Sequence, residues 1–425
     1  MAFAKDDRGT VPLSQKMTRG LSLCHLFGRN EMKTTELYYE SAYITEFDAT
    51  VLSCEAGGDG SFLVVLDRTA FFPEEGGQTC DRGVLTDDHG GTHRVLHVSI
   101  RDGIVSHRVG EAISEGTQVH GEIDFGHRFS NMQQHAAEHI FSGIVHSRFG
   151  YENVGFHLSD SEVTMDYSGQ LTDEQITEAE LAVNRAIWAD IEVRCTFPSR
   201  EELAAMDYRS KKELTGAIRI VEIPGYDTCA CCAPHVERTG EIGLLKVIRA
   251  QNYKGGTRVS ILCGERAFVY LSEEHGIVDG LARGFSTSPA RVCASVERLQ
   301  AQLEERKGRV ADLQSRLLCY ELQEIDADLR SVFLVKEADL DQNTIRKTVN
   351  GLAAAHPGFC GIFAGDAKTG YHYIIASGTE GGDAKNLQRI LSEEFGAKGG
   401  GSSQMIQGSF ACGDIRLVTE RCGAF

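Results

Sequence analysis

The chain has 425 residues, 41% hydrophobic and 24% charged, an ordinary globular composition that is long enough for about three domains. Its 61 acidic and 43 basic residues give a net charge of -18, so any nucleic-acid contact must be local. No apolar run approaches the roughly 18 to 20 residues that cross a bilayer, and no signal-peptide pattern is present, which predicts a cytoplasmic protein without a membrane partner. Thirteen scattered cysteines indicate reduced thiols and metal ligation rather than a disulfide framework.

The folded part of the chain is expected to begin after a polar, unpatterned extension at residues 1–31. Residues 32–125 alternate strand-like pieces, beginning at LYYESAYITEF, with turn signals such as EAGGDGS and DDHGG, which predicts a small antiparallel β-barrel. This segment contains the glycine-rich stretch FFPEEGGQTCDRG at 71–83. Its N–H groups could attract a phosphate, but it lacks the Lys-Ser/Thr of a P-loop. A turn holding the barrel against the next domain is therefore the favoured interpretation.

The next predicted element is a helix that contains the segment HAAEH. Ser130 with Gln133 is a capping-box signature, and Gly150 can end the run. The apolar residues recur at helical spacing: Met132, Ala136, Ile140 and Ile144. His135 and His139 therefore share a face. Two imidazoles one turn apart can hold one divalent cation, although such pairs also arise by chance on half-exposed helices.

Residues 126–270 as a whole are predicted to form an α+β domain. A strand pair around GFHLSD and VTMDYS is followed by a second helix from about Thr172 to Asp190. This helix is expected to take its apolar side from three residues, Ile176, Leu181 and Ile187.

A second group of metal-binding residue types lies in CCAPH, where Cys231 and His235 are four residues apart on a predicted loop. Added to two imidazoles on a helix, a thiolate and an imidazole complete the four ligands of a tetrahedral zinc site. Taken alone, Cys231 is also typical of a buried, inert cysteine, and His235 is also typical of a histidine hydrogen-bonded in a core. Ligands separated by about a hundred residues cannot be paired from spacing alone.

Residues 271–328 are predicted to be a helical arm. Between 288 and 325, apolar residues alternate three and four apart, which favours a coiled coil or helical hairpin. They are Val292, Val296, Leu299, Leu303, Val310, Leu313 and Leu317. The alternative is an amphipathic helix lying on its own domain, since Gly308 weakens the helix centre. Residues 329–425 then alternate strand-like and helical pieces, which predicts a compact C-terminal α/β domain ending in a glycine-rich loop, AKGGGSS.

Several of these motifs resemble one known family. HxxxH, then a downstream CxxxH followed by TGEIG, resembles the editing domain of alanyl-tRNA synthetases and their free-standing relatives, the alanyl-tRNA editing proteins of the AlaX type. The glycine-rich stretch looks like the family's own motif, in which the matching residues include Gly76, Gly77, Gln78 and Asp81. KGGTRVSILCGERA at 254–267 resembles the end of the editing domain. GGGSSQMIQGSF at 399–410 resembles the DHH-associated C-terminal domain of the long AlaX form.

The resemblance implies a trans-editing hydrolase that serves translation fidelity. It implies that Zn2+ is held by four ligands: His135, His139, Cys231 and His235. The substrate would be tRNA(Ala) carrying a wrong amino acid, chiefly serine and secondarily glycine, and no ATP-using aminoacylation half is evident. The candidate tRNA-binding residues are Lys254, Arg258, Gly399, Gly400 and Gly401. Basic runs are also typical of solvated faces, and a glycine run is also typical of a flexible loop.

The implied fold is α+β: a small barrel, a zinc-bearing editing domain, a helical arm and a C-terminal α/β domain that holds tRNA or forms a homodimer. Glu138 departs from the family, which often has Thr there in HTATH. It is the candidate general base or water-orienting group, with a solvent-facing helical carboxylate as the alternative. CCAPH replaces CGGTH, so the amino-acid pocket can differ.

Two other functions remain open at this stage. HAAEH also fits the inverzincin metallopeptidase pattern, although that interpretation leaves Cys231 and His235 unused. The second is a non-catalytic tRNA-binding protein in which saturated Cys/His coordination makes the zinc purely structural.

Overall fold

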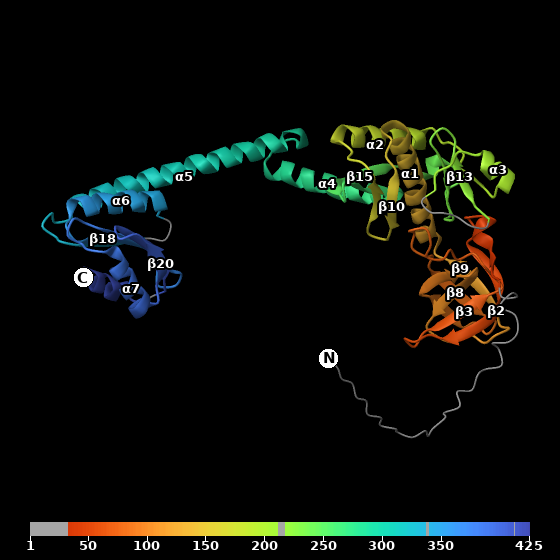
Figure 1. The fold of residues 1–425 in the computed structure, drawn as a ribbon, viewed down its shortest axis with the longest axis horizontal. Helices are drawn as coiled ribbons and strands as arrows, with labels where there is room; N and C mark the ends of the chain where they lie inside the picture. Colours follow the sequence, from red (N-terminus) through yellow and green to blue (C-terminus); the bar gives the residue numbers. More distant parts are fainter. Residues whose placement is uncertain (1–32, 211–216, 337–339, 412) are drawn as a thin grey trace, which may run out of the picture. The chain divides into compact units, whose positions relative to one another are not determined.

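The structure, a computed structural model, describes residues 33–210, 217–336, 340–411 and 413–425 (Figure 1). Within them the chain is a mixed α+β protein, as predicted. It divides into two compact units, Met1–Gly276 and Ile277–Phe425, and the boundary falls inside helix α4 (Gly264–Gly284). The predicted N-terminal extension lies outside the described residues. None of the described helices combines the length and apolar character that a membrane span needs.

The first half of unit one is a seven-stranded antiparallel sheet in the order β6-β5-β9-β2-β3-β8-β7. Its strands are β2 (Glu46–Ala56), β3 (Phe62–Leu66), β5 (Gly83–Asp87), β6 (Thr92–Val95), β7 (His97–Arg101), β8 (Ile104–Val109) and β9 (Gln118–Ile123). Burial alternates residue by residue along β8, as expected of a sheet with one face on a core. The Leu96 N–H, between β6 and β7, donates to the Arg108 carbonyl of β8 at 2.8 Å, so the sheet nearly closes on itself. The predicted barrel is confirmed in this nearly closed form.

The barrel begins later than predicted. LYY does not open a strand, because Leu37–Tyr39 form a short 3-10 helix, η2. The segment before it, β1 (Thr35–Glu36), pairs in parallel with β4 (Arg68–Thr69).

Helix α1 (Phe125–Phe149) is the central helix of the second half of unit one. Its N-cap is Asp124, whose side chain accepts the His127 N–H at 3.1 Å, so the predicted start at Ser130 is wrong. Gly150 ends the helix in the left-handed region at φ 72°, as predicted. Every residue from Asn131 to Val145 is buried. The helix is therefore an interior one, covered all round.

The elements around α1 match the predicted α+β pattern. An antiparallel sheet has the order β10-β11-β16-β15, and a small sheet has the order β12-β13-β14. Their strands are β10 (Asn153–Leu158), β11 (Val163–Tyr167), β12 (Arg194–Thr196), β13 (Ile220–Ile223), β14 (Asp227–Ala230), β15 (Leu245–Tyr253) and β16 (Gly256–Cys263). The helices are α2 (Asp173–Trp188), α3 (Arg200–Ala205) and the 3-10 turn η3 (Thr239–Ile242).

Helix α2 begins as predicted, because Thr172 and Gln175 form a reciprocal capping box. Ile176 and Ile187 are buried, but Leu181 is 44% exposed, so its assignment to the apolar side is wrong. Leu181 lies five residues after Ile176, which is off the i+3/i+4 face that carries the core.

Unit two holds the long helix α5 (Val292–Gln323), preceded by the 3-10 turn η4 (Pro289–Arg291), and a five-stranded sheet in the order β17-β18-β19-β21-β20. The strands are β17 (Val332–Lys336), β18 (Phe359–Asp366), β19 (Gly370–Ser377), β20 (Lys398–Gly401) and β21 (Met405–Phe410). The accompanying helices are α6 (Gln342–Ala355), α7 (Ala384–Phe395) and α8 (Ile415–Gly423).

The apolar row of α5 is mostly exposed. Leu318, near its C-terminal end, packs into the core of the C-terminal sheet. Five residues of the row are about half exposed: Leu299, Leu303, Val310, Leu313 and Leu317. An amphipathic helix lying along its own domain is therefore wrong for this stretch, and Gly308 interrupts no hydrogen-bonded turn.

The glycine-rich run near the C-terminus is not the predicted loop. It is the edge strand β20, in which Gly399 pairs with Gly408 of β21. A Cβ on Gly399 would lie 2.4 Å from the Gln407 carbonyl oxygen, so this close pairing requires glycine.

Candidate metal centre

The fold brings together the four residues that spacing alone could not pair. The possible ligand atoms of His135, His139, Cys231 and His235 all lie within 4.8 Å of one another. The first two come from α1, and the others follow β14. The Cys231 Sγ atom lies 3.6 Å from His135 Nε2 and 3.4 Å from His235 Nε2. The three imidazoles are buried, and only Cys231 is partly exposed.

Hydrogen bonds at their Nδ1 atoms orient the two imidazoles on α1. His135 Nδ1 donates to Gln78 Oε1 at 2.8 Å, and His139 Nδ1 donates to Asp227 Oδ2 at 2.8 Å. Each hydrogen bond places the proton on Nδ1 and leaves the Nε2 lone pair for a cation, which is how protein metal sites fix their histidines. Gln78 comes from the glycine-rich stretch of the barrel, so both halves of the first unit build this centre.

Asp227 is itself held in place. Arg209 donates to its two carboxylate oxygens at 2.7 and 2.8 Å. Burial would raise the pKa of Asp227, but the hydrogen bonds from His139 and Arg209 outweigh burial and hold that pKa below its ordinary value. Sequence reasoning missed both Asp227 and Arg209. The available signal was a carboxylate four residues before Cys231, in GYDTCAC.

The charges at the centre suit a divalent cation. Burial would raise the pKa of the Cys231 thiol, but the nearby His135 and His235 hold it well below its ordinary value. Burial lowers the pKa of His235 to about 3, so that ring is neutral. His235 Nδ1 is buried and has no hydrogen-bond partner among the described residues. Three imidazole nitrogens and one cysteine sulfur are the donor types of a tetrahedral zinc site.

Glu138 is fully buried, so the solvent-facing alternative is wrong. Its Oε1 atom accepts hydrogen bonds from Ser142 Oγ at 2.7 Å and from Asn153 Nδ2 at 2.5 Å. Ser142 Oγ in turn lies 3.0 Å from the hydroxyl of Tyr167. The carboxylate next to the candidate ligand His139 is thus fixed by α1, β10 and β11 together.

The glycine-rich stretch packs against β10. The Leu158 N–H donates to the Gly77 carbonyl at 2.7 Å, and a Cβ on Gly77 would lie 2.6 Å from the Phe156 carbonyl oxygen. Gly77 also has φ 86°, a conformation that favours glycine. A Cβ on Gly76 would meet Cys232 Sγ at 3.2 Å. Both glycines therefore allow the close approach that delivers Gln78 to His135.

Asp81 of the same stretch joins the barrel to α1. It forms an ion pair with Arg128 in which both side chains are fully buried, with Arg128 Nε 2.9 Å from each carboxylate oxygen. Asp81 also accepts the Phe72 N–H at 2.5 Å. Its role in the structure is to hold the two halves together.

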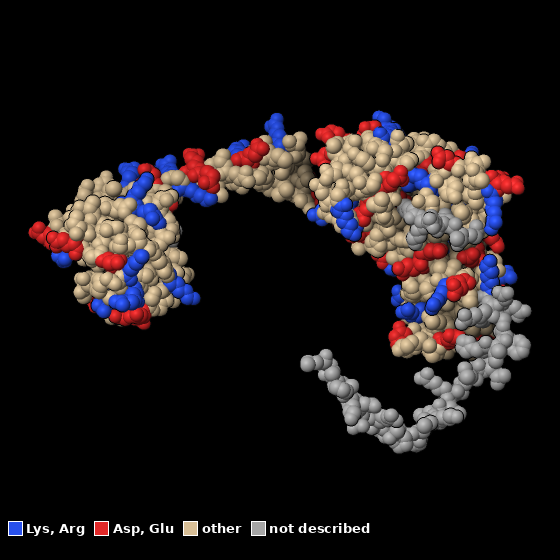
Figure 2. Space-filling model, viewed as in Figure 1, with Lys and Arg blue, Asp and Glu red and all other residues tan. Residues whose placement is uncertain are grey.

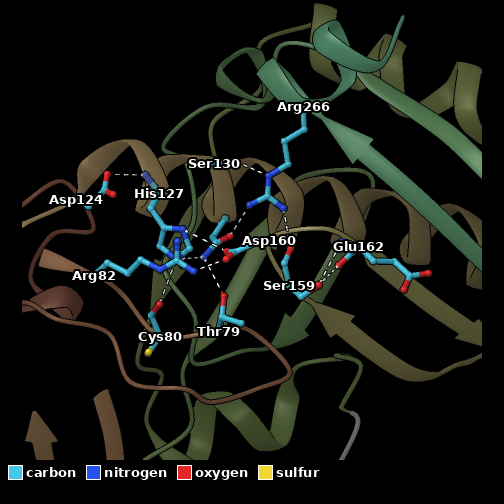
Figure 3. A network of polar contacts seen from close by, with 11 residues as sticks. Thr79, Cys80, Arg82, Asp124, His127, Ser130, Ser159, Asp160, Glu162 and Arg266 are labelled. Atoms are coloured by element: carbon cyan, nitrogen blue, oxygen red, sulfur yellow. Dashed lines mark hydrogen bonds and ion pairs between the residues drawn. The ribbon is translucent and has the colours of Figure 1, made fainter. Parts of the chain in front are cut away.

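A separate polar cluster lies at the start of α1 (Figure 3). The Arg266 guanidinium donates to Ser130 Oγ at 2.9 Å, to the Ser159 carbonyl at 2.8 Å and to Asn131 Oδ1 at 3.1 Å. It thus ties the first turn of α4 to α1 and to the turn between β10 and β11. Because these donors are occupied by the protein, Arg266 is a structural clamp rather than a free phosphate contact.

Several other basic residues of this region also contact protein groups. Arg258 lies 2.6 and 2.7 Å from the Asp166 carboxylate and 3.8 Å above the Tyr253 ring, and Lys254 lies 5.0 Å from the same ring. Lys246 pairs with Glu180 in the same way. On the face shown in Figure 2, basic side chains alternate with acidic ones. A phosphate at Arg258 would have to compete with Asp166.

The glycine candidates lie in the other unit. Gly399, Gly400 and Gly401 line a cleft of about 680 Å³ on the C-terminal sheet, together with Arg346 and His372. The cleft also has apolar walls, which include Ile345, Ile374 and Ile406.

Comparisons with known proteins agree with this architecture. Residues 17–126 match the family model for class II (A) tRNA synthetases, and residues 218–260 match the model for the second additional domain of threonyl and alanyl tRNA synthetases. The chain is 32% identical over 340 residues to the alanine–tRNA ligase of Halobacterium salinarum, covering 75% of this chain and 36% of the ligase. It is 31% identical over 395 residues to that of Thermococcus kodakarensis, covering 88% and 41%.

The chain is thus a relative of the tRNA synthetases that carries their second additional domain. More narrowly, its similarity to alanine–tRNA ligases supports the resemblance to the AlaX-like alanyl-tRNA editing proteins. It spans about two fifths of the length of the curated relatives it matches.

Proposed function

We propose that the chain hydrolyses the ester that joins a wrong amino acid, chiefly serine and secondarily glycine, to tRNA(Ala), in trans and without ATP. The observation that carries this proposal is the buried group of three imidazoles and one thiolate, oriented by Gln78 and Asp227. The similarity to alanine–tRNA ligases supports the tRNA as substrate. An aminoacyl ester is already activated, so positioning, carbonyl polarisation and a water suffice for its hydrolysis.

In this proposal His135, His139, Cys231 and His235 would hold zinc, with one of the four as a loose ligand so that the ion can supply Lewis-acid polarisation of the ester carbonyl. Glu138 accepts a proton from the attacking water or orients that water. Ser142 and Asn153 hold the Glu138 carboxylate for this task.

Residues 126–270 are the proposed deacylase domain, and residues 329–425 help to hold the tRNA. Lys254, Arg258 and the run Gly399, Gly400 and Gly401 are the proposed tRNA contacts. We also propose that the exposed apolar row of α5 pairs with the same row of a second copy, because its three-and-four spacing suits a coiled-coil seam.

The proposal is tested by measuring deacylation of seryl-, glycyl- and alanyl-tRNA(Ala) by the native protein, Cys231→Ala and Glu138→Gln. We expect rapid loss of serine, slower loss of glycine and retention of alanine. Cys231→Ala should abolish hydrolysis. Glu138→Gln should slow it about 100- to 10,000-fold if the carboxylate acts as a general base.

One competing function has specific support. Four protein ligands saturate a tetrahedral zinc ion, which is typical of a structural site in a non-catalytic tRNA-binding protein. Retention of tRNA without cleavage of any ester would establish that function. The peptidase alternative is disfavoured, because Cys231 and His235 lie within the same group as the HAAEH histidines.

A further inference from the structure

Among its four donor residues, the candidate metal centre is accessible to solvent only at Cys231. Its three imidazoles are at most 3% exposed, and Cys231 is the one donor of the four that is partly exposed. A substrate therefore has to approach across the loop that carries Cys231. Cys231 and its neighbour Cys232 pack against an aromatic cluster that includes Tyr38, Tyr39 and Phe72.

The outer part of this cluster is open to solvent. The Phe197 ring is 51% exposed and meets the half-buried Tyr39 edge to face, with the ring centroids 5.4 Å apart. The Arg219 guanidinium lies 5.6 Å from the centroid of the Tyr39 ring. Its Nη1 atom donates to the carbonyls of Cys231 at 3.1 Å and Ala233 at 2.8 Å. The cation thus lies between the Tyr39 ring and the loop that carries Cys231.

Three separate segments converge here. Tyr39 belongs to η2, Phe197 follows β12, and Arg219 directly precedes β13. Through its contact with Tyr39, the exposed Phe197 ring extends the aromatic cluster to the protein surface. Aromatic faces and arginine guanidinium planes are the surfaces on which unpaired bases of single-stranded RNA ends stack.

We propose that Tyr39, Phe197 and Arg219 form a stacking site for the unpaired 3′-terminal base of the tRNA. This inference rests on the proposed function, since the scissile ester is attached to the ribose of that same nucleotide. When the ester carbonyl lies at the metal centre, the base lies within one nucleotide's length of Cys231. The aromatic cluster packs against Cys231, the partly exposed donor.

The test is a binding cycle with two RNAs, intact tRNA(Ala) and tRNA(Ala) whose 3′-terminal nucleotide is abasic. Three variants are compared with the native protein: Phe197→Ala, Phe197→Tyr and Phe268→Ala. Phe268 is a matched control, a 68% exposed phenylalanine on α4. For the native protein, Phe197→Tyr and Phe268→Ala, loss of the base should weaken binding about 5- to 150-fold. For Phe197→Ala the two RNAs should bind with similar affinity.

Equal binding of both RNAs by the native protein overturns the stacking site, and so does an unchanged base effect in Phe197→Ala. The two proposals fail separately. A Phe197-dependent base effect without hydrolysis of any aminoacyl ester refutes the deacylase and leaves the stacking site standing. Hydrolysis without a Phe197-dependent base effect supports the deacylase and refutes the stacking site.

Discussion

Replacing Gln78 by alanine should weaken metal binding without unfolding the chain. The substitution removes the acceptor that lies 2.8 Å from His135 Nδ1 and leaves that N–H buried without a partner. Loss of such an outer contact costs about 10- to 100-fold in metal affinity, which corresponds to about 1.4 to 2.7 kcal/mol. The barrel should remain attached, because Gly77 bonds to Leu158 through backbone atoms alone.

The assay is a competition titration of zinc against a chromophoric chelator, with thermal unfolding of each apo-protein as a control. Gln78→Glu is the matched variant, because it keeps an oxygen acceptor for His135. It also removes an amide nitrogen, Nε2, that has no hydrogen-bond partner in the described part of the chain. Gln78→Glu should hold zinc more tightly than Gln78→Ala. Native affinity in Gln78→Ala would refute the idea that Gln78 orients a metal-binding imidazole.

Three further predictions follow from the contacts. Cys231→Ala should lower the zinc content from one ion per chain to near zero by elemental analysis, whereas Cys232→Ala, outside the ligand group, should retain it. Asp81→Ala should cost about 3 to 5 kcal/mol in urea unfolding, because it strands the buried charge of Arg128; a loss below about 1 kcal/mol would contradict a buried pair. Leu303→Asp should convert a dimer to a monomer in light scattering, and an unchanged mass would exclude pairing through α5.

Local patterns were sufficient to predict several features of this chain. The helix start near Thr172 and the helix end at Gly150 were predicted correctly, because both depend on hydrogen bonds between residues close in sequence. The shared face of His135 and His139 follows from helical periodicity. The misplaced helix start shows the limit of this reasoning. Ser130 has a capping residue's chemistry, but its hydroxyl instead accepts a hydrogen bond from Arg266, which is 136 residues away.

Exposure was decided by tertiary packing. Leu181 and the apolar row of α5 have the residue types of a core, yet both remain exposed. The glycine run at Gly399 has the composition of a loop, yet it pairs as an edge strand, because glycine admits the neighbouring backbone of β21 at close range. The composition of a segment therefore limits which contacts it can form, and the tertiary packing decides which of those contacts form.

For the candidate metal centre, too, some features follow from the sequence and others only from the tertiary structure. The sequence by itself determined the residue types, the helix and the loop, because these depend on near neighbours. Only the tertiary structure joined Cys231 and His235 to α1 and placed Gln78, 57 residues before His135, and Asp227, 88 residues after His139, behind the imidazoles. Such hydrogen bonds leave no periodic trace in the chain, because their geometry arises from the packing of the barrel and the small sheet around one buried helix.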